Sequence, residues 1–320
     1  MTAPRLLTVV LNWRTPEMSL RAAAAAHRAM QGIAGEIVIV DNDSGDGSFE
    51  TMQAGIAGMD RVRVVQSGRN GGFGAGMNAG MRAGLADGGR PDYVYLLNSD
   101  AFPAPGAIAA LLAHLEATPE AGLAGGHIHG PDGAPHVTCF RFPSILGELE
   151  GAARIGPLSR LLRRHAVPRP LLTATQPVDW LAGASLMIRQ SVLDEIGGFD
   201  ETFFLYFEET DLCRRAARAG WRTDYVHESR VEHIGSVSTG MKHWDRVPDY
   251  WFASRRHYFI KTHGRAYLGA VTLAHLFGAG TGALWRLIRR KGSPPPPHFL
   301  RDLVRGDLRA TFDRRERTRP

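Results

Sequence analysis

Two adjacent carboxylates, Glu208 and Glu209, open a predicted amphipathic helix and could take a proton from a reacting hydroxyl. They follow the aromatic run FFLYF, and the helix after them places Leu212, Ala216 and Ala219 on one buried face at i, i+4, i+7 spacing. Glu208 continues that face. The start of a helix favours negative charge by ~0.3–1 kcal/mol, which would keep an inward-pointing acid ionised. The pattern predicts a general base at Glu208 or Glu209, with helix capping as the alternative.

The third acid of this helix, Asp211, faces Arg215 and Arg218 one turn further along. This is the spacing of i,i+4 ion pairs on a helix surface. We therefore interpret Asp211 as a structural residue and assign it no chemistry.

The segment YVYLLNSDA places Asn98 and Asp100 just past an apolar strand, with both side chains on the same side. A hard divalent cation bound to a diphosphate takes oxygen ligands, of which the protein supplies one or two. Asp100 would suffice as the carboxylate if phosphate oxygens and His233, in the later segment VEHIGSVST, completed the site. The alternative is an ordinary turn or helix cap ahead of Pro103 and Pro105.

The segment EIVIVDNDSGDGS places Asp41 at the end of an apolar strand. A carboxylate there can accept a hydrogen bond from a nucleobase imide N–H at the sheet edge. Asp43, Ser44 and Asp46 are explained by turn and N-cap preferences. We therefore assign nucleotide binding to Asp41 alone within this run.

The glycine-rich segment GRNGGFGAGMNAG matches the G-x-G-x-x-G/A dinucleotide fingerprint formally. That match raises the alternative of a nicotinamide-dependent oxidoreductase. The fingerprint belongs after the first strand, however, whereas this segment follows the third, and glycine excess also permits close helix packing. Asn70 and Asn78 flank the glycines, and their amides could bind ribose or diphosphate or could be purely structural.

Short apolar runs alternate with helical patterns through the first half of the chain. The runs are LLTVVLN, EIVIV, VRVVQ and YVYLL, and the helical patterns cover Glu17 to Met30, Ser48 to Ile56, Phe73 to Leu85 and Gly106 to Leu115. Alternation of this kind predicts an α/β fold with a parallel sheet covered by helices. Ligands bind at the carboxyl ends of such strands, where polar residues gather here: Asn12, Asp41, Asn70, Asn98 and Asp100. The middle, Gly126 to Gln176, predicts loops, a hairpin around PDG and one basic helix near Leu158 to His165.

Composition indicates a folded protein. The chain has 320 residues, of which 44% are hydrophobic, enough to bury a large core in one big domain or two modest ones. Cys139 and Cys213 have no ligand spacing, so neither a zinc site nor a disulfide framework is supported, and a reducing compartment fits. The apolar run near the start is too short for a signal peptide. We predict a cytoplasmic protein.

Several segments together resemble glycosyltransferase family 2, in the branch that includes bacterial rhamnosyltransferases. They are TVVLNWRTPE, VIVDNDSGDGS, NGGFGAGMNAG, LLNSDA, the block from WLAGASLMIR to EETDLCRR, and HIGSVST. The resemblance implies a GT-A nucleotide-diphospho-sugar transferase fold, a mostly parallel sheet flanked by helices, with a helical C-terminal extension. It also implies inversion at the anomeric carbon and a divalent metal, Mg²⁺ or Mn²⁺.

The resemblance also assigns roles to single residues. Asp41 matches the nucleobase-binding aspartate, Asn98-Ser99-Asp100 matches the D-x-D element, and Glu208-Glu209 matches the Glu-Asp pair that holds the catalytic base. The residues expected to bind the donor are then Asn12, Asp41, Asn70, Gly72, Asn78, Asn98 and Asp100. The expected metal ligands are Asp100 and His233. Trp180 lies where acceptor contacts are expected. Two positions depart from the family pattern. Asn98 leaves Asp100 as the sole carboxylate of its motif, and Glu209 is one methylene longer than aspartate, so Glu208 stays open as the base.

The basic character of the chain belongs to its tail. The net charge is +6, and the stretch from Ser254 onward contains 15 Lys and Arg against 4 Asp and Glu. We predict a catalytic domain over residues 1–264 and a basic helical extension over 265–320. This distribution argues against a nucleic-acid-binding body and favours an anionic surface met by the C-terminus alone.

The tail also carries an apolar stretch, Tyr267 to Leu284, followed by Trp285 and a basic cluster. It is marginal in length for a spanning helix and is diluted by glycines. A helix packed on the catalytic domain is one interpretation. We favour a peripheral helix held at the cytoplasmic face of an anionic membrane, where Trp and Lys/Arg are stabilised.

The sequence as a whole predicts an inverting, metal-assisted glycosyltransferase. Its partners would be a nucleotide-diphospho-sugar donor and a saccharide or lipid-linked acceptor, with rhamnose favoured by the branch resemblance. A nicotinamide-dependent oxidoreductase and a non-catalytic nucleotide-sugar-binding protein are the alternatives.

Overall fold

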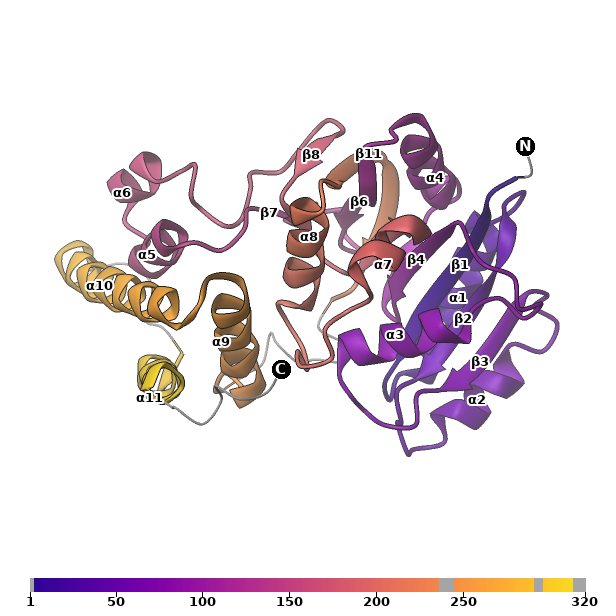
Figure 1. Cartoon of the computed structure of the whole chain (residues 1–320), viewed down its shortest axis with the longest axis horizontal. Helices are drawn as coiled ribbons and strands as arrows, with labels where there is room; N and C mark the ends of the chain where they lie inside the picture. The colour runs from indigo at the N-terminus through magenta and orange to yellow at the C-terminus, as the bar shows by residue number, and fades with distance from the viewer. Residues whose placement is uncertain (1–2, 236–244, 291–295, 313–320) are drawn as a thin grey trace. The chain divides into compact units, whose positions relative to one another are not determined.

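The computed structural model describes residues 3–235, 245–290 and 296–312 (Figure 1). Its contacts divide the chain into two compact units. The first comprises residues 1–140, 169–204 and 208–242, and the second comprises residues 141–168, 205–207 and 243–320. The second unit therefore joins three separate stretches of chain. The division predicted from the sequence, a catalytic domain over residues 1–264 and a basic helical extension over 265–320, stays a prediction.

The first unit alternates strands and helices, as the apolar runs predict. Its strands are β1 (Arg5–Asn12), β2 (Ala34–Asp41), β3 (Val62–Gln66), β4 (Tyr93–Asn98), β5 (Ala101–Pro103), β6 (Ala121–His129), β7 (Cys139–Phe140), β8 (Gln176–Val178), β9 (Trp180–Leu181), β10 (Ser185–Arg189) and β11 (Arg222–His233). Its helices are α1 (Pro16–Ala29), α2 (Ser48–Gly55), α3 (Phe73–Ala83), α4 (Ala107–Ala117), α7 (Gln190–Ile196) and α8 (Glu208–Arg218).

The central sheet has nine strands within the described residues, in the order β3-β2-β1-β4-β10-β6-β11-β5, with β8 added on β11. Strands β3, β2, β1 and β4 run parallel, and β6 runs parallel to β11. Strand β10 is antiparallel to both of its neighbours, β4 and β6. The predicted mostly parallel sheet is confirmed, and the carboxyl ends of β1, β2 and β4 share one edge.

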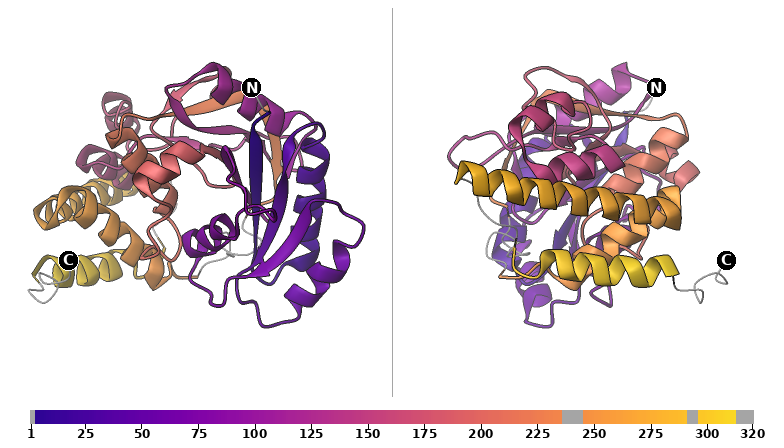
Figure 2. Two further views of the ribbon diagram at one scale, coloured as in Figure 1. Left: turned by 45° about the vertical axis from the view of Figure 1, so that its right-hand side comes forward. Right: turned by 90° about the vertical axis from the view of Figure 1, so that its left-hand side faces the viewer.

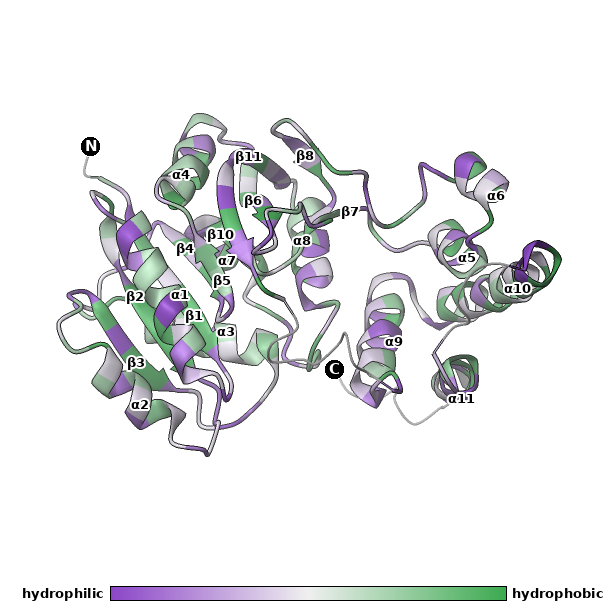
Figure 3. Ribbon diagram, turned by 180° about the vertical axis from the view of Figure 1, so that it is seen from behind, coloured by the Kyte–Doolittle hydropathy of each residue, from purple (hydrophilic) through white to green (hydrophobic). Residues whose placement is uncertain are grey.

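The sheet is covered on both faces, which explains why its strands read as continuous apolar runs. Helices α1, α2 and α4 pack on one face, and α3, α7 and α8 lie over the other (Figures 1 and 3). Leu6, Leu7, Val9 and Val10 of β1 are therefore fully buried. Figure 3 shows hydrophobic colouring along strands of this sheet.

The glycines of α3 allow this helix to approach the sheet closely. A Cβ atom at Gly76 would lie 2.4 Å from the Leu11 side chain, and one at Gly80 would lie 2.3 Å from Val9. The two positions are four residues apart and share one helix face. Close packing thus accounts for the glycine-rich sequence that matched a dinucleotide fingerprint.

The second unit is helical. It contains α5 (Ile145–Ala153), α6 (Gly156–Leu161), α9 (Asp249–His263), α10 (Arg265–Arg289) and α11 (Phe299–Phe312). Helix α10 packs against α5, α9 and α11, and α11 runs alongside it (Figure 2, right). The basic helix predicted near Leu158 to His165 is α6, which ends at Leu161. Helix α5 was not predicted, although Ser144 caps it by accepting a hydrogen bond from the Gly147 N–H at 3.1 Å.

A buried ion network holds the helices of the second unit together. Arg255 is fully buried and donates to Asp307 Oδ2 at 2.9 Å and to Glu148 Oε2 at 3.0 Å. His275 Nδ1 lies 2.8 Å from the same Glu148 oxygen. Burial alone would raise the pKa of Glu148, but Arg255 and His275 lower it to about 2. Removing one partner of such a network is strongly destabilising, because it leaves an uncompensated buried charge.

Candidate active site

Asn12 and Asp41 meet at the carboxyl ends of β1 and β2, where they are register partners. Asn12 Nδ2 donates to Asp41 Oδ1 at 2.9 Å, and the Ser44 hydroxyl donates to the same oxygen at 2.6 Å. The Ser44 backbone N–H is 3.3 Å from Asp41 Oδ2. Asp41 is therefore held in one orientation at the sheet edge, with Oδ2 the less tightly engaged oxygen.

The glycine loop is attached to this edge through Asn42, a residue that the sequence did not single out. Its amide nitrogen donates to Asn70 Oδ1 at 3.1 Å and to the Gly72 carbonyl at 3.2 Å. The Gly72 N–H donates back to Asn70 Oδ1 at 3.1 Å. Asn70 and Gly72 thus lie near the end of β2, where the sequence analysis predicts nucleotide binding. Gly72 itself lies against the backbone carbonyl of Phe204, so in this structure its missing side chain makes room for the protein backbone.

Asn78 has a structural role. Its amide donates to the Phe199 carbonyl at 2.8 Å and accepts from the Phe199 N–H at 2.9 Å. A further bond reaches Glu201 Oε1 at 3.1 Å. These contacts clamp α3 to the segment that precedes α8 and use most of the amide's hydrogen-bonding capacity. A direct contact between Asn78 and a nucleotide stays a prediction.

Gly72→Ala should destabilise the fold far more than Gly68→Ala. Both glycines have left-handed backbones, with φ of +88° and +79°. A Cβ at Gly72 would lie 1.7 Å from the Phe204 carbonyl oxygen, whereas one at Gly68 meets nothing within 4 Å. We expect Gly68→Ala to cost about 1–2 kcal/mol for backbone strain and Gly72→Ala to cost several more. Urea midpoints measure both, and equal midpoints would contradict the close approach.

Asp100 and His233 meet where β5 pairs with β11, with Ala101 opposite His233. His233 Nε2 lies 3.1 Å from Asp100 Oδ1, and Asn98 Nδ2 lies 3.5 Å from His233 Nε2. The Gly235 N–H donates to Asp100 Oδ2 at 3.1 Å. The structure therefore brings together the three side chains that the sequence proposed for the metal and diphosphate.

These side chains fit a divalent metal that substrate oxygens help to hold. In the described part of the chain, no group of three or more His, Cys, Asp and Glu side chains is arranged to hold a metal ion alone. Asp100 is 5% exposed and offers a carboxylate, Asn98 offers an amide oxygen, and His233 offers an imidazole nitrogen. Mg²⁺ and Mn²⁺ accept such a set when water and phosphate oxygens complete their coordination.

Glu208 and Glu209 begin α8, as predicted, and they differ in environment. Glu209 Oε1 accepts a hydrogen bond from the Gly183 N–H at 3.1 Å. The dense surroundings of Glu209 raise the pKa of its carboxyl above the ordinary value, although part of its surface stays open to solvent. Glu208 is only 2% exposed and lies against Gly74. A carboxyl with raised pKa and an open face is the better general base of the two.

Asp211 forms the ion pair expected from its spacing. Arg215 Nε donates to Asp211 Oδ2 at 2.7 Å, and the same guanidinium donates to the carbonyls of Ile196 and Gly198, each at 2.7 Å. The structural interpretation of Asp211 is therefore confirmed.

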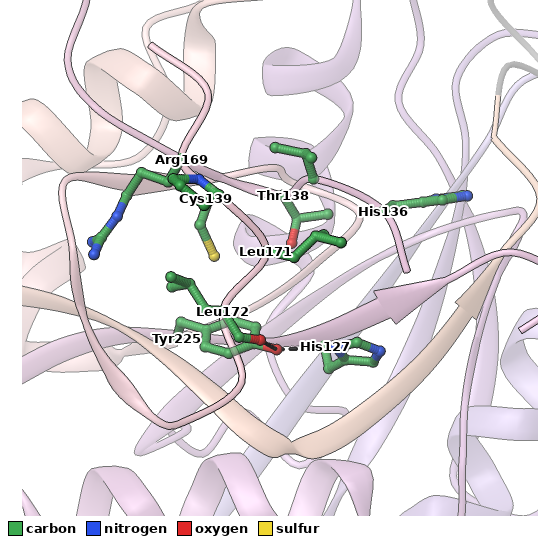
Figure 4. A pocket seen from close by; sticks show the side chains of 10 residues that line it. His127, His136, Thr138, Cys139, Arg169, Leu171, Leu172 and Tyr225 are labelled. Carbon is green, nitrogen blue, oxygen red and sulfur yellow. Dashed lines mark hydrogen bonds between the residues drawn. The ribbon is translucent and has the colours of Figure 1, made fainter. Parts of the chain in front are cut away.

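Trp180 stacks on Phe140, with ring centroids 4.2 Å apart. Elsewhere in the first unit is a small hollow lined by His127, His136, Val137, Thr138, Cys139, Arg169, Pro170, Leu171, Leu172 and Tyr225 (Figure 4). His136 lies between this hollow and the Asp100–His233 contact, since its ring centroid is 6.3 Å from that of His233.

Strand β11, whose Tyr225 lines this hollow, has an irregular register against β6. The register of β11 against β6 shifts between Val226 and Arg230. Bulges re-aim side chains, and this one places His227 against His127, with ring centroids 5.5 Å apart. Tyr225 Oη lies 3.0 Å from His127 Nδ1. Burial, followed by the charge of Arg230, lowers the pKa of His127 and so favours its neutral imidazole.

Comparison with known proteins decides the family. A model described as Glycosyltransferase like family 2 matches residues 4–257. The chain belongs to glycosyltransferase family 2. This protein is thus a glycosyltransferase, and the alternatives of an oxidoreductase and of a non-catalytic binding protein are set aside.

Curated relatives place this family 2 enzyme near rhamnosyltransferases. It is 35% identical over 212 residues to the N-acetylglucosaminyl-diphospho-decaprenol L-rhamnosyltransferase of Mycobacterium tuberculosis, covering 64% of this chain and 68% of the relative. It is 33% identical over 72 residues to the rhamnosyltransferase WbbL of Escherichia coli, covering 22% of this chain and 27% of that one.

Solved structures confirm the GT-A fold. The mannosyltransferase PcManGT from Pyrobaculum calidifontis, in complex with GDP-Man and Mn²⁺, matches with a TM-score of 0.58 at 15% identity, covering 98% of this chain and 89% of that one. GalNAc-T7 with UDP, GalNAc and Mn²⁺ matches with a TM-score of 0.57 at 13% identity, covering 96% of this chain and 58% of that one. At such identities the likeness establishes the fold alone.

Several side chains of this glycosyltransferase site were missed from the sequence. Asn42 and Tyr225 were not singled out, and His127 and His136 fell in the segment from Gly126 to Gln176, which was predicted to be mostly loops. The pair His127 and His129, two apart on a strand, was the available signal, since alternate residues of a strand share a face.

Proposed function

We propose that this glycosyltransferase is an inverting enzyme that moves a sugar from a nucleoside diphosphate to a hydroxyl of a lipid-linked saccharide. The observation that carries the proposal is the pair of functional groups at its site. One is the Glu209 carboxyl, with its raised pKa and its anchor on the Gly183 N–H. The other is the Asp100–His233 contact at the end of β11.

Rhamnose is the sugar we propose, and the reason is similarity. The Mycobacterium tuberculosis relative is named as an L-rhamnosyltransferase acting on N-acetylglucosaminyl-diphospho-decaprenol. An acceptor of this class is a saccharide joined through a diphosphate to a polyprenol. We propose the same class of acceptor for this chain, with Trp180 contacting the acceptor saccharide.

The donor nucleotide would bind at the carboxyl ends of β1 and β2. The orientation of Asp41, fixed by Asn12 and Ser44, suits it to accept a hydrogen bond from a nucleobase N–H through Oδ2. Asn70, Gly72 and Asn98 would line the path from the base to the diphosphate.

Asp100 and His233 would hold the diphosphate end of the donor. A divalent metal bound there would supply Lewis-acid stabilisation of the departing nucleoside diphosphate. Asp100 would provide the carboxylate ligand, and His233 would provide an imidazole to the metal or to a phosphate oxygen.

Glu209 would act on the acceptor. As the acceptor hydroxyl attacks the anomeric carbon, Glu209 accepts its proton, the new carbon–oxygen bond forms, and the bond to the diphosphate oxygen breaks with its electron pair. One displacement from the face opposite the leaving group inverts the configuration. General-base catalysis of this kind typically contributes 10²–10⁴-fold.

Anomeric NMR of the product should show inversion relative to the donor. The assay offers dTDP-, UDP- and GDP-sugars, with and without Mn²⁺, to a prenyl-diphospho-N-acetylglucosamine acceptor. We expect transfer of rhamnose from one of these nucleotide donors, with inversion. A product of retained configuration would eliminate the single displacement, and transfer of another sugar alone would eliminate rhamnose.

We also propose that the enzyme works at the cytoplasmic face of a membrane. The apolar helix α10 and the basic tail support this location, and a lipid-linked acceptor would require it.

A further inference from the structure

Helix α10 carries a continuous row of large apolar side chains that no other part of the described structure covers. Its members are Leu273, Phe277, Leu284, Leu287 and Ile288, each at least 59% exposed. At 100° per residue they lie within an arc of roughly 100° along one side of the helix, and Gly280 falls within the same arc. We call this row the α10 stripe. Contiguous exposed apolar surface of this kind marks an interaction site.

The opposite face of α10 is fastened to the rest of the helical unit. Cβ atoms at Gly278 and Gly282 would each lie 2.5 Å from a backbone oxygen of α5, so the two helix backbones are in contact. The Thr272 hydroxyl donates to Asp307 Oδ2 at 2.7 Å, and His275 bonds Glu148. In the described ranges, α10 is the one helix long and apolar enough to cross a membrane. A spanning α10 would have to abandon these buried polar partners, so the stripe is available only from its outer side.

Charge on the same unit identifies the kind of surface that the stripe fits. The residues of the second unit include 21 Lys and Arg against 8 Asp and Glu, a net charge of +13, whereas the first unit carries −7. Arg289, the last residue of α10, and its C-cap Arg290 directly follow Ile288 at the end of the stripe, and Arg289 lies over the Trp285 ring at 4.8 Å. An apolar row that ends in a tryptophan and arginines is matched to a lipid surface with anionic headgroups.

We propose that the α10 stripe docks on an anionic lipid bilayer. The apolar side chains insert at the boundary between headgroups and acyl chains, while the arginines at the end of α10 contact the headgroups. The buried face keeps its contacts with α5 and α11, so docking is peripheral. This inference deepens the proposed function, because a lipid-linked acceptor lies in such a surface. The biological role of docking rests on the proposed function, whereas vesicle binding itself does not.

Vesicle binding tests the proposal without any substrate. The full-length protein is sedimented with vesicles of phosphatidylglycerol and phosphatidylcholine in equal parts and with pure phosphatidylcholine vesicles. We expect binding to the mixed vesicles that Phe277→Glu and Leu284→Glu each weaken at least about 10-fold, as expected for losing one inserted large apolar side chain. Arg289→Gln with Arg290→Gln should weaken binding by about 5-fold per arginine.

Leu161→Glu is the matched control. Leu161 is 78% exposed on α6 of the same unit, so this change adds the same charge away from the stripe. Circular dichroism of each variant confirms folding. A loss of vesicle binding in Leu161→Glu equal to that in the stripe variants, or a wild-type protein that binds neither vesicle, would overturn the proposal.

A wild-type dimer that Phe277→Glu dissociates would also overturn the proposal, because the stripe would then bind a second copy of the chain. Glycosyl transfer to a soluble acceptor is measured separately. This assay shows whether the proposed catalytic function holds when membrane docking fails, and the reverse.

Discussion

Glu209→Gln should lower the rate of glycosyl transfer by at least about 100-fold while donor affinity stays near that of the wild type. The amide keeps the size of the side chain and can still accept the Gly183 N–H, but it cannot take a proton from the acceptor hydroxyl. Steady-state kinetics give the rate, and calorimetry with the nucleotide-sugar gives the affinity. Glu208→Gln is the matched comparison, and near-normal transfer by the Glu209 variant together with a collapse in the Glu208 variant would move the base to Glu208.

The pH profile provides a second measurement of the same group. Burial raises the pKa of Glu209, so the carboxylate form needed for proton removal appears at higher pH than for an exposed glutamate. The value of kcat/KM should therefore rise with pH through a limb displaced upward from the ordinary glutamate range. That limb should be absent from the residual activity of Glu209→Gln. An unchanged limb in the variant would assign it to another group.

Asp100→Asn should abolish the metal dependence of donor binding. The substitution keeps the shape of the side chain and removes the sole carboxylate of the N-S-D segment. We expect donor affinity in the presence of Mn²⁺ to fall at least about 100-fold. Loss of a residue that only hydrogen-bonds a metal ligand already lowers metal affinity by up to about 100-fold, and Asp100 is proposed to be a ligand itself. Calorimetry with and without Mn²⁺ measures the effect directly.

Asp43→Asn serves as the control for this change. Asp43 is exposed on the turn after β2, and its left-handed backbone, with φ of 59°, is one that asparagine also adopts readily. Thermal unfolding checks that both variants are folded. If Asp100→Asn kept a metal response equal to that of Asp43→Asn, the metal would have to bind elsewhere.

The sheet was predictable because its physical signal is local. Strands buried on both faces must be apolar throughout, so LLTVVLN, EIVIV and YVYLL identified β1, β2 and β4. The antiparallel insertion of β10 between β4 and β6 could not be predicted in this way. It depends on pairings between residues far apart in sequence, such as Leu186 with Leu96 and with Gly125.

The site was predictable where strand ends carry its residues. Asn12 with Asp41, and Asn98 with Asp100, follow from position alone. The contact of Asp100 with His233 was predicted from family resemblance and is realised by β5 pairing with β11. The tie between Asn42 and Gly72 and the clamp of Asn78 on Phe199 are amide contacts across loops, which periodicity does not encode.

The interleaving of the two units has a consequence for biosynthesis. Helix α5 emerges from the ribosome more than a hundred residues before α10, the helix whose glycines pack against it. Translation proceeds at roughly 5–20 residues per second, so Arg255 and His275 are synthesised on the order of ten seconds after Glu148 on α5. A chain cut after residue 264 never supplies α10 and α11, so Glu148 would lose His275, and Arg255 would lose Asp307. The C-terminal helices thus complete a structure begun in the middle of the chain.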